Sequence, residues 1–157
     1  MKNFLLILAV LITTNVFGQK FQKLEVNVGA SLFAPITKNV TWNDKGWGQR
    51  VQFAKPRNDK FAYLLNLGLQ QNKGGYIQLP VLLGARHIVY KQLYVTYGTG
   101  ATFFKDENAK FTLTAGWGFI TKKIIVEQSV FRATRANYTT LNVTHNNNIG
   151  ITVLYRL

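Results

Sequence analysis

Apolar residues occupy every second position in eight segments of this chain, and this alternation restricts its fold more than any other feature. A period of two is typical of β-strands with one apolar face, and nothing after Gly18 has the period of an amphipathic helix of useful length. The segments are 24–33, 47–53, 61–70, 74–90, 93–104, 111–120, 124–132 and 149–157. The sequence therefore predicts an all-β chain.

The strand lengths and the connections between them indicate a barrel that crosses a membrane. Strands of about nine to twelve residues suit a tilted crossing of a bilayer, whereas strands of soluble proteins average roughly five or six. Tight basic connections fall near 55–60, 90–92 and 121–123. Mostly longer polar connections fall near 35–46, 71–75, 105–110 and 133–148. Short turns on one rim, longer loops on the other and an even strand count predict an eight-stranded antiparallel up-and-down transmembrane β-barrel.

The face opposite the apolar one decides which side is in contact with lipid. It is small and polar, with Thr, Asn and Gln between Gly29, Ser31, Gly68, Gly84, Gly98, Gly100, Gly116 and Gly118. The lumen of an eight-stranded barrel is just wide enough to be filled by side chains, so small and polar residues suit it. The bulky apolar face is expected to face lipid. Aromatic residues near strand ends, Phe131 among them, would form the interfacial girdles.

The segment 74–90 holds a proline inside a strand. Alternation places Ile77, Leu79, Val81, Leu83 and Ala85 toward lipid, and Gln78, Pro80, Leu82, Gly84 and Arg86 toward the lumen. Proline cannot donate a ladder hydrogen bond. Pro80 is therefore expected to mark a bulge or a locally unpaired position.

Residues 1–18 have the layout of a signal peptide, with Lys2, an apolar run and then small and polar residues up to Gly18. The apolar run is far shorter than the roughly 20 residues that span a bilayer as a helix. We therefore expect cleavage before Gln19, with a barrel domain over 19–157.

The chain is strongly basic and contains no cysteine. Its net charge of +13 falls to +12 without Lys2, which favours an anionic partner. Export makes nucleic acid an unlikely choice, and we expect none. Outer-membrane lipid and lipopolysaccharide are the expected anionic partners.

Four segments, taken in order, resemble small outer-membrane β-barrel proteins of Bacteroidetes, the PorT-like family. They are YIQLPVLLGAR (76–86), LYVTYGTGATFF (93–104), FTLTAGWGF (111–119) and GITVLYRL (150–157). The resemblance covers 61–157 well and the first two strands loosely. It implies an outer-membrane barrel but no common activity, so function must be argued from a site.

The end of the chain resembles an insertion signal for the barrel assembly machinery. The residues concerned are Gly150, Val153, Tyr155 and Leu157. Such barrels often end in Phe, and Leu157 departs from that pattern. We expect the machinery to be a partner during insertion.

Candidate chemistry is sparse. The two histidines and six acids form no metal-ligand cluster, and no phosphate loop, cofactor motif or catalytic group is identified. Five charged residues are predicted to face the lumen, where isolated charges are costly and pairing is expected: Glu25, Arg50, Arg86, Glu127 and Arg156. This network would fill and rigidify the lumen, or line an ion path.

The leading hypothesis is a non-enzymatic outer-membrane barrel, a structural or accessory subunit docked on a larger outer-membrane complex. The polar loops 37–46 and 132–148 are the candidates for outside contacts. One alternative is a lipid A-modifying hydrolase that uses His145, although its neighbours are Asn rather than Ser. Another is a secreted, soluble lipocalin-like ligand-binding barrel.

Overall fold

The computed structural model describes residues 24–36, 45–72, 75, 77–105, 107–137 and 142–157, with side chains at 107, 135–137 and 142–146 left undescribed. The predicted signal peptide and most of the first predicted loop lie outside these residues. The cleavage of 1–18 therefore stays a prediction.

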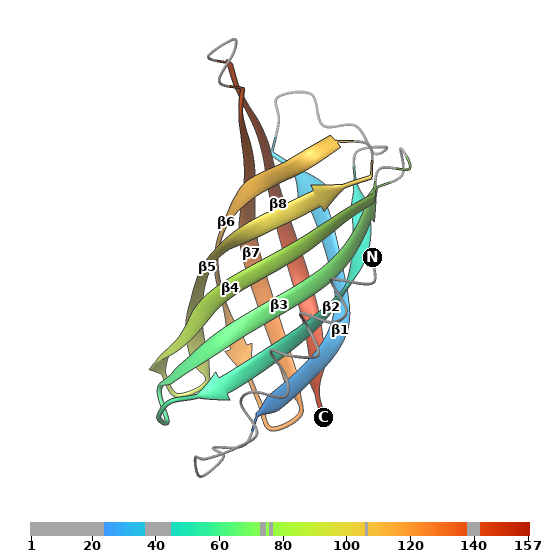
Figure 1. The fold of residues 1–157 in the computed structure, drawn as a ribbon. Coiled ribbons are helices and arrows are strands. Elements are labelled where there is room, and N and C mark those ends of the chain that lie inside the picture. Colours follow the sequence, from blue (N-terminus) through green and yellow to red (C-terminus); the bar gives the residue numbers. More distant parts are fainter. Residues whose placement is uncertain (1–23, 37–44, 73–74, 76, 106, 138–141) are drawn as a thin grey trace, which may run out of the picture.

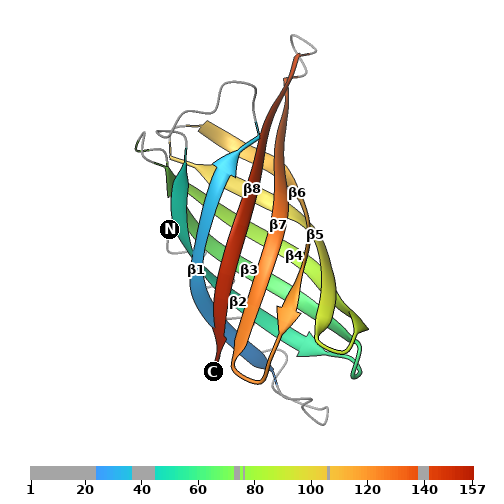
Figure 2. The same ribbon diagram turned by 180° about the vertical axis from the view of Figure 1, so that it is seen from behind.

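Eight antiparallel strands close into a single barrel (Figures 1 and 2). They are β1 (Glu25–Pro35), β2 (Gly46–Pro56), β3 (Phe61–Asn72), β4 (Ile77–Tyr90), β5 (Leu93–Phe104), β6 (Glu107–Ile120), β7 (Ile124–Asn137) and β8 (Asn142–Arg156). Each strand pairs with the next along the chain, and β8 closes the barrel against β1, for example through Ala30 and Val153. The predicted number, direction and order of strands are confirmed.

The barrel has two unlike rims. The first, which we call the turn rim, carries the tight connections 57–60, 91–92 and 121–123, together with the start of β1 and the end of β8. It lies at the bottom of Figure 1. The opposite rim, the loop rim, carries the remaining connections. In membrane barrels of this type the short turns face the periplasm, which gives the turn rim its expected side.

The prediction of a long loop over 132–148 is wrong for most of that segment. Strand β7 continues to Asn137 and β8 begins at Asn142, with residues paired up to Asn137 and Asn142. The hairpin rises beyond the neighbouring strands at the top of Figure 1. The apolar alternation that identifies the other strands is absent here although the ladder continues, as expected for a hairpin that extends past the lipid-facing belt.

The outer surface is apolar and exposed, as alternation predicted. Leu32 is 69 % exposed, Leu83 64 % and Phe111 57 %, values that a water-soluble protein avoids over so wide a belt. This surface excludes the soluble lipocalin-like alternative. Ala85 points outward as expected, yet it is buried, since it pairs in register with Tyr63 and Tyr97. Within the described part of the chain, no helix is long and apolar enough to cross a bilayer.

Two apolar clusters lie inside the barrel. One joins Tyr94, Ile120, Ile125 and Leu154 near the turn rim, and the other joins Leu82, Phe131 and Ala133 nearer the loop rim. Phe131 is 8 % exposed, so its expected place in an outer aromatic girdle is wrong. Bulky residues thus fill two parts of the lumen, and polar residues lie between and around them.

Pro80 interrupts the ladder without a bulge. The β3–β4 register runs through Leu67–Val81 and resumes at Gln70–Gln78, so pairing is lost between Gly68 and Pro80 while the register is kept. A Cβ atom on Gly68 would lie 2.8 Å from Pro80 Cγ, so the glycine makes room for the ring. The unpaired position was predicted correctly. No register shift accompanies it, since the shifts of β5 with its neighbours lie at strand ends.

Candidate functional site

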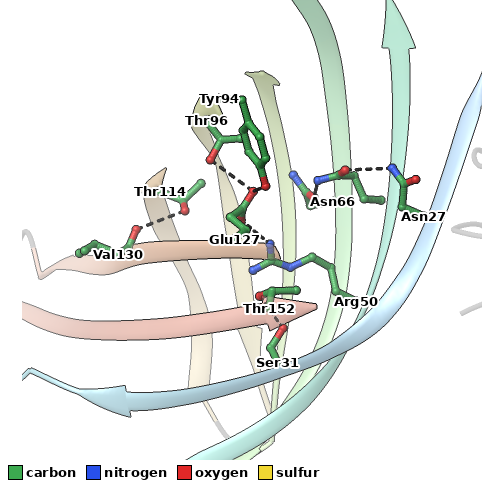
Figure 3. A network of polar contacts seen from close by, with 11 residues as sticks. Asn27, Ser31, Arg50, Asn66, Tyr94, Thr96, Thr114, Glu127, Val130 and Thr152 are labelled. Carbon is green, nitrogen blue, oxygen red and sulfur yellow. Dashed lines mark hydrogen bonds and ion pairs between the residues drawn. The ribbon is translucent and has the colours of Figure 1, made fainter. Parts of the chain in front are cut away.

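The central ion pair of the lumen joins β2 to β7. Arg50 Nη1 donates to Glu127 Oε1 at 2.7 Å, and the side chains are only 15 % and 5 % exposed. Both residues occupy inward positions of their strands, which the period of two dictates. Tyr94 Oη and Thr96 Oγ1 of β5 each donate to the other carboxylate oxygen, Oε2, at 3.4 Å (Figure 3). Glu127 is therefore contacted from β2 and β5 and ties three parts of the wall together.

A second group of charges lies at the turn rim. Glu25 Oε2 accepts from Arg86 Nη2 at 3.1 Å, and Glu25 Oε1 accepts from Arg156 Nη2 at 2.8 Å. Arg156 Nη1 also donates to the backbone oxygen of Thr121 at 2.8 Å. One carboxylate thus serves two guanidinium groups, and these contacts join β1, β4, β8 and the turn after β6.

Tyr94 connects the two groups of charges. Its ring lies 6.0 Å from Arg86 Cζ, and its hydroxyl reaches Glu127. Tyr94 was not among the residues predicted from the sequence to belong to this site. The sequence feature that could have pointed to Tyr94 is the glycine opposite it. Tyr94 pairs across strands with Gly118, where a Cβ atom would lie 2.6 Å from Tyr94 Oη, so the glycine leaves room for the ring.

The structure therefore brings all five predicted lumen charges into one connected arrangement. It runs from Arg156 through Glu25 and Arg86 to the Tyr94 ring, and then through Glu127 to Arg50. With three guanidinium groups and two carboxylates, the arrangement carries one excess positive charge. Pairing of this kind offsets the cost of keeping charges away from water.

Neutral side chains extend the network across β1, β2 and β3. Asn27 Nδ2 donates to Gln52 Oε1, and Gln52 Nε2 donates to Asn66 Oδ1, both at 3.0 Å (Figure 3). The hydroxyls of Ser31 and Thr152 lie 2.8 Å apart across the β1–β8 closure. Since hydrogen-bonded side chains occupy the middle of the lumen, the arrangement is suited to holding a barrel rigid.

The residues of the resembled insertion signal lie in the last half of β8, with Leu157 directly after it. Val153, Tyr155 and Leu157 point outward and are 49 %, 48 % and 76 % exposed, whereas Gly150 lies on the inward face. The three outward side chains form an apolar stripe at the turn rim. This places them where an assembly factor could contact them, and their role stays a prediction.

The structure adds no evidence for the catalytic candidate His145 or for a metal site among the described residues. The backbone of His145 belongs to β8, but its side chain lies outside the described residues, so the hydrolase alternative gains no geometry. Among the residues that the structure describes, no group of three His, Cys, Asp or Glu side chains could hold a metal ion.

Comparison with solved structures identifies the fold. The chain is similar to a de novo designed transmembrane β-barrel, with a TM-score of 0.60 and 14 % identity over 88 % of this chain and 100 % of that chain. It is similar to Neisserial surface protein A (TM-score 0.58, 10 % identity, 85 % and 96 % covered). It is also similar to the outer membrane protein Ail of Yersinia pestis (TM-score 0.57, 10 % identity, 86 % and 100 % covered). The sequence matches no family model and no curated protein. The chain has the fold of small outer-membrane β-barrels, and identities this low speak for the fold alone.

Proposed function

We propose that this protein is a small, non-enzymatic barrel of the outer membrane that serves as a structural or accessory subunit of a larger outer-membrane complex. The observation that carries the proposal is the lumen filled by side chains, crossed by the Arg50–Glu127 pair and holding two apolar clusters. A barrel filled in this way offers its surfaces, rather than an interior path, for function.

The location is supported by the lipid-facing belt, by the fold and by the predicted signal peptide. The turns and their flanks carry six basic residues against one acid, Asp59: Lys55, Arg57, Lys60, Lys91, Lys122 and Lys123. A basic rim at the membrane surface attracts anionic lipid head groups. Outer-membrane lipid and lipopolysaccharide are the lipid partners of the proposal, and the barrel assembly machinery is its partner during insertion.

Membership of the PorT-like family belongs to the proposal as well. It rests on the four segments that resemble that family, above all the Pro80 segment. The packing of Pro80 against Gly68 gives a physical reason for a proline and a glycine at facing positions of β4 and β3.

The docking surface of the proposal is the tip of the β7–β8 hairpin. Pairing of β6 with β7 ends at Thr134, and pairing of β1 with β8 ends at Asn148, while β7 and β8 remain paired with each other up to Asn137 and Asn142. The outer edges of the tip are thus without a neighbouring strand among the described residues. Such edges can accept a strand or loop of a partner.

The test is affinity purification from native membranes with a tagged chain. A variant in which an Asn-Gly turn replaces 135–144 removes the tip and keeps the parts of β7 and β8 that pair with β6 and β1. A matched control exchanges 37–44 for a Gly/Ser segment of equal length. We expect a stoichiometric membrane partner with the wild type and the control, and its loss with the shortened hairpin. Equal recovery from all three would contradict docking at the tip, and a chain found free in the periplasm would contradict the whole proposal.

Measuring ion conductance in planar bilayers distinguishes a lumen closed by its side chains from a lumen that conducts ions. We expect no steps in planar bilayers for the wild type. Steps in the wild type would overturn the accessory role, because they would show a continuous path past Arg50 and Glu127.

A further inference from the structure

The turn rim opens into a cavity of about 750 Å³. This volume lies within the roughly 300–1,000 Å³ of small-molecule sites. Its apolar wall includes Ala62, Ile88 and Ile120, and its charged residues are Glu25, Asp59, Lys60, Arg86, Lys122 and Arg156. The cavity therefore combines an apolar wall with a charged one at the end of the barrel.

The charged wall carries more cationic side chains than acidic ones. Glu25 is shared by Arg86 and Arg156, and Lys60 and Lys122 add two cations against the exposed Asp59. Four cationic side chains thus face two acidic ones. Electrostatics alone favours an anionic occupant.

Arg86 gives an independent indication of the same kind. Its side chain is only 6 % exposed, and its Nη2 is used by Glu25. Its Nη1 is buried and has no hydrogen-bond partner among the described residues. A buried donor without an acceptor is costly, and more so on a charged group. A small shift of the guanidinium toward the cavity that it lines would give Nη1 an acceptor, if an oxyanion lay there.

We propose that the turn-rim cavity binds a small amphipathic oxyanion, that is, a carboxylate or phosphate attached to an apolar group. The planar guanidinium fork matches both anions. The anionic end lies against Arg86 and Arg156, with Lys122 at the mouth. The apolar end lies against Ala62, Ile88 and Ile120. The site is separate from the hairpin tip, so either can fail without the other.

The test is isothermal titration calorimetry on the full barrel in neutral detergent, with phenyl phosphate as the probe. Inorganic phosphate and phenol carry the two halves of the probe, and we expect each to bind at least about tenfold more weakly than phenyl phosphate. Loss of a charge-assisted hydrogen bond in R86Q is expected to weaken binding by about tenfold or more. Equal binding of phosphate and phenyl phosphate would overturn the proposed site.

Two adjacent lysines provide a matched pair of variants. Lys122 lines the cavity and Lys123 does not, although both are exposed turn-rim lysines. We expect K122Q to weaken phenyl phosphate binding by about two- to threefold, as for an exposed charge, and K123Q to leave it unchanged. Equal effects would mean that the probe senses only the general charge of the rim, which would overturn the site.

Folding of R86Q is checked by heat-modifiable gel mobility, and the lysine pair keeps the proposal testable if this variant misfolds.

The source of the oxyanion is distinguished by reconstitution in phosphatidylcholine vesicles with and without phosphatidylglycerol. Weaker phenyl phosphate binding in the presence of phosphatidylglycerol would assign the site to a lipid head group. Unchanged binding would assign it to a soluble anion. No binding in either vesicle would overturn the proposal.

Discussion

Removing the charge of Glu127 is expected to destabilise the barrel strongly, because it leaves a guanidinium enclosed in the lumen without its counter-ion. The variant E127Q keeps an acceptor for Tyr94 and Thr96, so the change isolates the ion pair with Arg50. Breaking a buried pair from one side typically costs about 3–5 kcal/mol. Since Arg50 is 15 % exposed and retains some contact with water, we expect the lower end, about 3 kcal/mol.

The partner variant R50Q leaves the carboxylate of Glu127 unpaired and is expected to cost a similar amount. The double variant R50Q/E127Q buries two neutral amides, which hydrogen-bond without a charge to solvate. Its free energy of unfolding is expected to lie within about 1–2 kcal/mol of the wild type, because replacing a whole buried pair is far less costly than breaking it. The cycle then gives a coupling energy of at least about 2 kcal/mol, well above the ~0.5 kcal/mol of independent sites.

The assay is urea unfolding in phosphatidylcholine vesicles, followed by tryptophan fluorescence and by heat-modifiable gel mobility. K91Q serves as a control, since it removes an exposed charge at the turn rim and is expected to change stability by less than about 0.5 kcal/mol. If the double variant loses the sum of the two single losses, Arg50 and Glu127 are not coupled, and the argument for a cross-braced lumen fails.

Three further outcomes follow from other parts of the barrel. L83R places a charge at the middle of β4 on the lipid face, where Leu83 is 64 % exposed. It should cost about 2–4 kcal/mol in vesicles, and a loss below about 0.5 kcal/mol would put that face in water. G118A drives a methyl group against Tyr94 Oη and the backbone oxygen of Val126. We expect a loss of about 1–3 kcal/mol in the same assay, and wild-type stability would contradict the packing. Y155A removes an outward aromatic of β8, and we expect less heat-modifiable barrel in cells despite unchanged refolding in vitro. Equal amounts in cells would remove Tyr155 from the insertion signal.

Most of the fold could be predicted from the sequence because lipid imposes a period of two. In β4, for example, Leu79 and Leu83 alternate with Gln78 and Leu82, and each side is where the pattern put it. The same reasoning failed for 132–148, since a strand that leaves the bilayer has no apolar face to display. Strand pairing there comes from backbone hydrogen bonds, which leave no compositional trace.

The residues of the candidate site could be predicted from the sequence, but the ion pairs between them could not. Alternation identified Glu25, Arg86 and Glu127 as inward-facing, and the cost of isolated charges required partners. Which cation meets which acid depends on the tilt and stagger of the strands around the barrel, and single-strand patterns do not contain that information. Tyr94 was passed over for the same reason, because its contact with Glu127 joins β5 to β7, strands that are not neighbours.

The central claim is that a filled barrel stands in lipid with its apolar face outward, and a nitroxide scan along β6 tests it most directly. The chain contains no cysteine, so single cysteines at 111–115 can be spin-labelled one at a time in phosphatidylcholine vesicles. Positions Phe111 and Leu113 are exposed on the outer face, whereas Thr112 is fully buried. We expect collision of the label with dissolved oxygen to alternate with a period of two, high at 111, 113 and 115 and low at 112 and 114. Labels at 111, 113 and 115 that collide mainly with a water-soluble nickel chelate, or a scan without alternation, would contradict it.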